Sequence, residues 1–117
     1  MQKVMIHGKL PTANEYIDAC RKNRYAAAKM KRDAEELIIW QVKRLLPIKT
    51  KVKIRMIWYE ENRRRDPDNV RFGVKFILDA LQKCGKLKND NSNYIAGFED
   101  SYVYGKGQGV LIEVMPE

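Results

Sequence analysis

Residues 51–59, KVKIRMIWY, alternate strictly along the chain. One side of an extended backbone would carry only apolar side chains, namely Val52, Ile54, Met56 and Trp58. The other side would carry a mostly basic mixture, namely Lys51, Lys53, Arg55, Ile57 and Tyr59. Because successive side chains of a strand point to opposite faces, this pattern predicts a half-buried strand with a basic outer face.

A long helix is predicted before this strand and a second helix after it. Residues 24–46 carry apolar side chains at helical spacing, with Gln41 as the one interruption, and Pro47 ends the helix. The second helix is predicted from residue 67 or 68 to residue 83, where Gly85 can close its C-terminus. Its core-facing side would carry Val70, Val74, Ile77, Leu78 and Leu81.

Shorter elements complete the chain. We expect a first strand over residues 3–10, one or two helical turns around 14–19, and two further strands over 95–104 and 109–115. The glycine-rich segment 105–109 favours a hairpin turn over a phosphate loop, because no Lys-Ser/Thr and helix follow it. The order βαβαββ predicts an α+β (mixed α/β) domain, with a mixed sheet packed by two main helices.

Length and composition fit one small domain over residues 1–117. The chain has 44% hydrophobic and 32% charged residues, which makes it richer in charge than an average globular protein. No apolar run approaches the roughly 20 residues of a membrane span, and the first residues lack the apolar segment of a signal peptide. Cys20 and Cys84 lack the spacing of a zinc site or a disulfide framework. We therefore expect a cytoplasmic protein with reduced cysteines.

The net charge is +8, and its basic excess lies mainly in the first half of the chain. Twelve lysines and arginines but only three acids lie between Cys20 and Trp58. Such a surface suits a polyanion, since each phosphate that a cation neutralises releases condensed counterions. The alternative is a solvated surface that only keeps the protein soluble. Charge by itself therefore suggests nucleic acid without establishing it.

The segment 63–69, RRRDPDN, lies between the predicted strand and the second helix. In one interpretation Asp66 caps the helix, Pro67 takes its first position and Asp68 interacts with the helix dipole. In the other, the carboxylates of Asp66 and Asp68 converge on a hard cation, Mg²⁺ or Mn²⁺. Asp90, in the loop after the second helix, is then the candidate for a third ligand.

Helical projection places Lys75 and Asp79 on the same side as Asp68. At about 100° per residue, both lie within roughly 20° of Asp68. They can form an i,i+4 ion pair on a solvated surface, worth about a few tenths of a kcal/mol. Alternatively, Lys75 projects toward the same metal site.

A phosphodiester substrate would explain why carboxylates are set among arginines. A divalent ion held by the three aspartates can polarise a phosphoryl oxygen and activate a bound water, while Lys75 stabilises the developing charge. The flanking phosphates would contact Arg63, Arg64, Arg65 and Arg71.

These residues resemble the RusA family of Holliday-junction resolvases, small dimeric Mg²⁺-dependent crossover junction endodeoxyribonucleases common in bacterial phages and prophages. The resemblance rests on segment 63–69, on Lys75 four residues before Asp79-Ala80-Leu81, on Gly85 and on Asn89-Asp90. The order of the predicted elements fits the rest of the chain.

The resemblance implies a role for each matching residue. Asp66, Asp68 and Asp90 would bind Mg²⁺, for which Mn²⁺ can substitute, and Lys75 would be the catalytic lysine. Asn69 and Asp79 would orient the metal ligands. Some family members have the lysine four residues after the second aspartate, where this chain has Phe72, so aligning Lys75 implies a three-residue insertion.

The implied substrate is a four-way DNA junction, nicked symmetrically on two strands of like polarity in a bacterial cell. Symmetric incision needs two active sites, so a twofold homodimer is expected. Neither a small-molecule cofactor nor a membrane is expected as a partner. Junction arms would bind the basic helix from Arg24 and the outer face of strand 51–59, through Lys51, Lys53 and Arg55.

Two other functions remain open from the sequence. One is a non-catalytic DNA- or RNA-binding module whose acids only cap helices and form ion pairs. The other is a less selective flap or branched-DNA nuclease with the same site.

Overall fold

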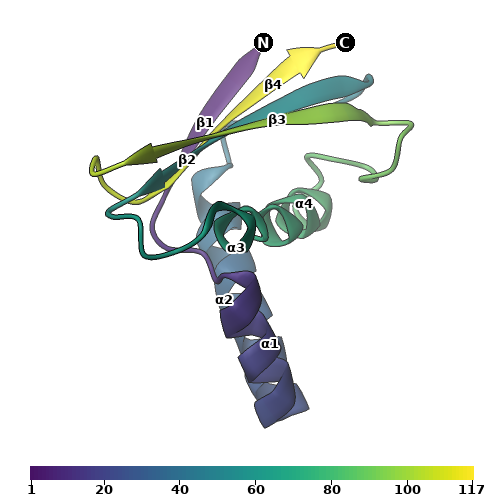
Figure 1. The fold of residues 1–117 in the computed structure, drawn as a ribbon. Coiled ribbons are helices and arrows are strands. Elements are labelled where there is room, and N and C mark those ends of the chain that lie inside the picture. The colour runs from purple at the N-terminus through teal and green to yellow at the C-terminus, as the bar shows by residue number, and fades with distance from the viewer.

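The computed structural model describes all residues from Met1 to Glu117. A four-stranded sheet forms one layer, and all the helices lie on one face of it (Figure 1). The elements follow in the order β1 (Gln2–His7), α1 (Ala13–Lys22), α2 (Arg24–Gln41), β2 (Val52–Glu60), α3 (Pro67–Arg71), α4 (Val74–Lys83), β3 (Ile95–Tyr104) and β4 (Gly109–Pro116).

The sheet is mixed, with strand order β1-β4-β2-β3. β4 pairs antiparallel with both β1 and β2, whereas β3 pairs parallel with β2. The α+β class and the mixed sheet predicted from the sequence are therefore confirmed. α2 and α4 pack on each other beneath the sheet and are the two main helices of the core.

β2 alternates as its sequence predicts. The side chains of Val52, Ile54, Met56 and Trp58 are at most 5% exposed, and those of Lys51, Lys53 and Arg55 are exposed on the opposite face. No helix covers that outer face (Figure 1). The hydrophobic core consequently lies between the inner face of the sheet and the helices.

The first helical segment is longer than predicted. α1 covers ten residues instead of one or two turns, because Thr12 and Glu15 form a reciprocal capping box at its N-terminus. α2 ends at Gln41, five residues before the predicted end at Leu46. Gln41 interrupts the apolar stripe because its side-chain amide accepts from the backbone N–H of His7 at 2.7 Å and donates to the His7 carbonyl at 2.9 Å.

The second predicted helix is divided into α3 and α4 at Phe72 and Gly73. The amides of Gly73, Lys75 and Phe76 donate three residues back instead of four, which tightens the backbone at this point. A β-carbon on Gly73 would lie 3.2 Å from both Leu10 Cδ1 and Trp58 Cζ3. Glycine therefore lets the α3–α4 junction approach the sheet closely.

The glycine-rich segment 105–109 does not form the predicted hairpin. β3 and β4 are not neighbours, because β2 lies between them. The segment instead crosses the end of β2, where the Gly105 N–H donates to the Glu60 carbonyl at 2.8 Å. Gly105 and Gly107 adopt positive φ angles of 85° and 93°, which side chains other than glycine rarely tolerate.

None of the helices combines the length and the apolar character that crossing a membrane would require.

Replacing Gly73 by valine should destabilise the fold by about 1–3 kcal/mol, the usual range for overpacking a filled core. The backbone of Gly73 is ordinary helix, with φ −55° and ψ −20°, so packing alone accounts for the effect. Gly97→Val is the matched control, because a β-carbon there meets no atom within 4 Å. Urea unfolding of both variants would measure the difference. Equal stability of Gly73→Val and wild type would contradict the close packing at this junction.

Candidate metal and nucleic-acid site

Asp66 lies at the N-terminus of α3, where the chain leaves β2 for the helices. Its backbone is extended, with φ −68° and ψ 147°, and Pro67 begins the helix as predicted. The Asp66 carbonyl accepts from the Val70 N–H at 3.0 Å, but its carboxylate makes no capping hydrogen bond. Asp66 therefore occupies the N-cap position as predicted, but its side chain does not cap the helix, and its carboxylate is left for another partner.

Asp68 follows on the first turn of α3 and is also exposed. Neither Asp66 nor Asp68 accepts a side-chain hydrogen bond or forms an ion pair within the chain, although eleven ion pairs are formed elsewhere. Two unpartnered carboxylates two residues apart provide oxygen ligands of the kind that Mg²⁺ binds together with waters and substrate phosphates. This donor set fits a hard divalent cation.

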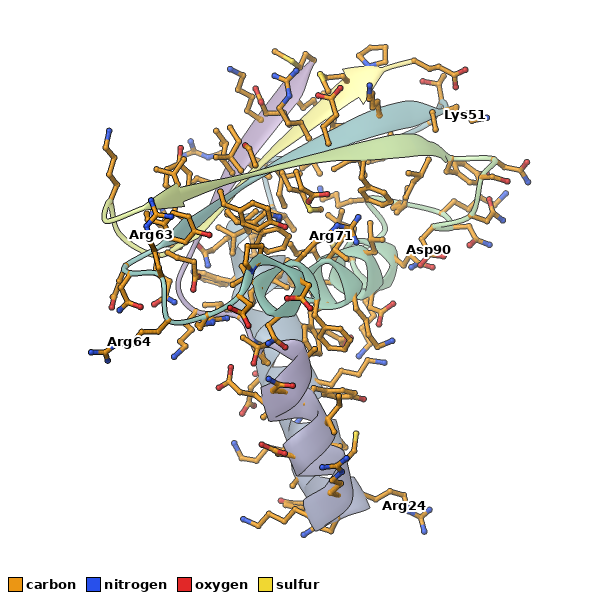
Figure 2. All side chains as sticks on the ribbon, viewed as in Figure 1. Arg24, Lys51, Arg63, Arg64, Arg71 and Asp90 are labelled. Atoms are coloured by element: carbon orange, nitrogen blue, oxygen red, sulfur yellow. The ribbon has the colours of Figure 1, made fainter.

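Asp90 lies away from this pair. It is exposed in the loop after α4, and its backbone N–H donates to the Asn89 side chain at 2.8 Å. Figure 2 shows Asp90 at the opposite end of the α3–α4 pair from Arg63 and Arg64, which belong to the same segment, 63–69, as Asp66. No three His, Cys, Asp or Glu side chains of the chain are close enough together to hold a metal ion. One chain therefore does not bring the three predicted ligands together.

Lys75 and Asp79 form the ion pair that the sequence left as an alternative. Lys75 Nζ lies 3.7 Å from Asp79 Oδ2, and Lys31 of α2 approaches the same oxygen at 3.6 Å. Asp79 thus links α4 to α2. The helical projection therefore placed Lys75 and Asp79 together correctly, although the tight turn at Gly73 separates their helix α4 from α3, which carries Asp68.

Asn69 also has a contact that the sequence did not suggest. Its Oδ1 atom accepts from the backbone N–H of Asn14 at 3.2 Å. This bond fixes the start of α1 against α3. Asn69 therefore joins the base of α1 to the helix that carries Asp68.

The three consecutive arginines differ in their surroundings. Arg63 lies over the ring of Tyr104, 4.3 Å from its centroid, and the Arg64 side chain extends away from the protein with no partner (Figure 2). Arg65 is largely buried, donates to the Leu10 carbonyl at 2.8 Å and lies 3.3 Å from Glu60 Oε1. The expectation that Arg65 contacts DNA is corrected accordingly: Arg65 connects segments of the protein, and Arg63 and Arg64 remain at the surface.

Asp100 organises the region beneath β3, and sequence reasoning missed it. Its Oδ1 accepts from Trp58 Nε1 and its Oδ2 from Arg71 Nε, both at 2.9 Å. Arg71 was predicted to contact DNA, but it joins α3 to the sheet in this way. The sequence contained two signals of this contact. Asp100 lies two residues from both Phe98 and Tyr102, so in a strand its side chain points to the same inner face as theirs. A buried tryptophan N–H also needs an acceptor.

The same region includes Asp68. Burial raises the pKa of the Tyr102 hydroxyl, and the negative charges of Asp100 and Asp68 act in the same direction. Arg71 opposes this shift. The carboxylate of Asp68 therefore lies within electrostatic range of the Asp100 cluster, at the edge of β3.

The basic outer face of β2 is partly neutralised by neighbouring strands. Glu99 of β3 lies 2.6 Å from Lys53 and 3.1 Å from Arg55, and its hydrogen bonds from these two cations lower the pKa of its carboxyl. Arg55 also approaches Glu113 of β4 at 3.4 Å, and Lys51 lies 3.9 Å from Glu117. The cations of β2 are thus less available to DNA than the sequence suggested.

Comparison with known proteins yields no match, either to a protein-family model or to a curated protein.

Removing the Asp100 side chain should destabilise the protein by about 1–3 kcal/mol, because the buried Trp58 N–H and the Arg71 guanidinium are both left without their acceptor. Asp100→Asn should have a smaller effect than Asp100→Ala, since the amide oxygen still accepts from Trp58. Thermal or urea unfolding of the two variants would test this order. Equal destabilisation in both would show that the Trp58 hydrogen bond contributes nothing.

Proposed function

We propose that this protein is a metal-dependent endodeoxyribonuclease that nicks branched DNA, with the four-way junction as its preferred substrate. The observation that supports the proposal most directly is the pair of exposed, unpartnered carboxylates of Asp66 and Asp68. Their own segment supplies the surface cations Arg63 and Arg64 beside them. The resemblance of this segment to the RusA family supplies the reaction and the substrate.

Asp66 and Asp68 would hold the divalent ion, Mg²⁺ or in its place Mn²⁺. When bound, such an ion polarises a phosphoryl oxygen and makes a coordinated water more acidic. Arg63 and Arg64 would bind the phosphates on either side of the scissile bond. Arg71 would act indirectly, because it fixes α3 to Asp100 and so sets the position of Asp68.

The position of Asp90 bears on the assembly. Symmetric incision of a junction calls for a twofold dimer, and we propose that in this dimer the Asp90 loop of one protomer lies beside the Asp66 of its partner. We therefore assign Asp90 to the site of the partner protomer. This arrangement reconciles the three-aspartate motif with the separation of Asp90 from Asp66 in a single chain.

A non-catalytic DNA- or RNA-binding module is the second candidate. The ion pair between Lys75 and Asp79 favours it, because it engages the lysine that the nuclease would use. So does the separation of Asp90 from the other two aspartates. Cleavage assays distinguish the two candidates directly.

Asp66→Asn should reduce Mg²⁺-dependent cleavage of a synthetic four-way junction more than about a hundredfold, since even groups that only orient a metal ligand typically contribute tenfold to a hundredfold. Binding of the junction should be retained. Asp18→Asn is a control with the same charge change, at an exposed acid of α1 that forms no ion pair. Full cleavage by Asp66→Asn would reject the proposed metal site. Equal rates of the wild-type protein on junctions, flaps and linear duplex would reject junction specificity.

Mixing two inactive variants tests whether Asp90 acts across the dimer. In a heterodimer of Asp66→Asn and Asp90→Asn, one site would combine the intact Asp66 of one chain with the intact Asp90 of the other. Nicking should therefore reappear on mixing, up to about half the wild-type rate per heterodimer, because one of its two symmetric sites is restored. If each site belonged to one chain, both sites would carry a substitution and the mixture would stay inactive. Full activity of Asp90→Asn alone would exclude Asp90 as a ligand.

A further inference from the structure

We propose that the outer end of the α1–α2 hairpin binds the phosphate backbone of a duplex DNA arm at a distance from Asp66 and Asp68. We define the tip cluster as Arg21, Lys22 and Arg24. The choice of DNA as the ligand rests on the proposed function. The position and the charge of the tip cluster are observed independently of that proposed function.

The hairpin projects away from the rest of the molecule. α1 begins beside α3 and runs outward, α2 returns toward the sheet, and the turn between them is the point farthest from the strands (Figure 1). Figure 2 shows Arg24 at this outer end, reaching away from the body of the protein. The sequence from Cys20 to Tyr25 is fully at the surface, and Tyr25 is 74% exposed.

The tip cluster has no acidic partner in the protein. None of its three cations forms an ion pair, whereas Lys53 and Arg55 of β2 are paired with Glu99. Farther along α2, Lys29 and Lys31 are paired with Asp33 and Asp79. The ion pairs of Lys29, Lys31, Lys53 and Arg55 therefore neutralise part of the basic excess of the first half of the chain, whereas all three cations of the tip cluster stay without an acidic partner.

Folding does not account for all of this charge. Arg21 and Lys22 occupy the last turn of α1, where cations stabilise the helix dipole. Arg24 is the first residue of α2, where a cation is unfavourable, and the first turn of α2 contains no acid. A phosphate bound at the tip would neutralise the charge of Arg24, so that this cation would stabilise the complex.

The geometry connects the tip to the candidate site. The base of α1 is held to α3 by the bond between Asn14 and Asn69, at 3.2 Å. Ten helical residues extend about 15 Å at 1.5 Å each. A duplex that leaves the Asp68 region along α1 would therefore reach the tip about four to five base pairs from the cut, at 3.4 Å per pair.

Binding to a junction in buffer without divalent ions tests the tip separately from cleavage. The variant replaces Arg21, Lys22 and Arg24 by alanine. Its control replaces Lys43, Arg44 and Lys49, exposed cations near the other end of α2 that have no acidic partner. Both variants remove three positive charges. The slope of log K against log salt should fall in magnitude by roughly 2–3 in the tip variant, at about 0.9 for each phosphate that the protein no longer neutralises, and remain close to the wild-type value in the control.

A second series varies the length of the junction arms. Wild type and tip variant should differ on arms of about twelve base pairs and bind alike on arms of about three, which end before the tip. An unchanged salt slope, an equally weakened control variant, or a difference that persists on the shortest arms would overturn the inference. So would a tip-dependent interaction with anionic lipid vesicles that is not accompanied by one with DNA. If the wild type binds DNA through the tip but never cleaves it, the proposed nuclease fails and this inference stands.

Discussion

The carboxylate of Asp100 is the contact on which the geometry of the candidate site depends. It joins Trp58 of the central strand β2 to Arg71 at the end of α3. α3 is a single short helix of five residues, and a helix of that length has little stability of its own. Its orientation is therefore determined by its attachments to the sheet, and Asp66 and Asp68 take their positions from it.

Much of the fold could be predicted because each strand and helix carries its own periodicity. The alternation in residues 51–59 and the apolar face of residues 70–81 depend only on local spacing, and both agree with the observed burial. The divided helix was missed because its cause is distant in sequence: Gly73 must fit against Leu10 and Trp58. The connection over residues 105–109 was misread for a similar reason, since glycines reveal a turn without revealing which strands it joins.

The candidate site shows the same limit. Counting charges along the chain gave strand 51–59 a basic outer face, because its neutralising acids, Glu99 and Glu113, are more than forty residues away. Spacing also could not show that Arg65 would be buried while Arg64 remained free. The pairing of side chains in three dimensions decides which cations are available. It narrows the expected nucleic-acid surface to Arg63 and Arg64 before α3 and to the outer end of the α1–α2 hairpin, and makes the cations of β2 less available.

The place of β4 in the sheet has a consequence for the order in which the protein folds. This strand is the last element of the chain, yet it lies between β1 and β2 and supplies the only pairing partner of β1. Gln2 cannot pair before Val114, its partner across the ladder, has been made. During synthesis the α1–α2 hairpin can form from local contacts, but the sheet cannot be completed until β4 has been made. Until β4 is made, β1 and the facing edge of β2 have no partner across the sheet, and such unpaired edges make this stage of folding prone to aggregation.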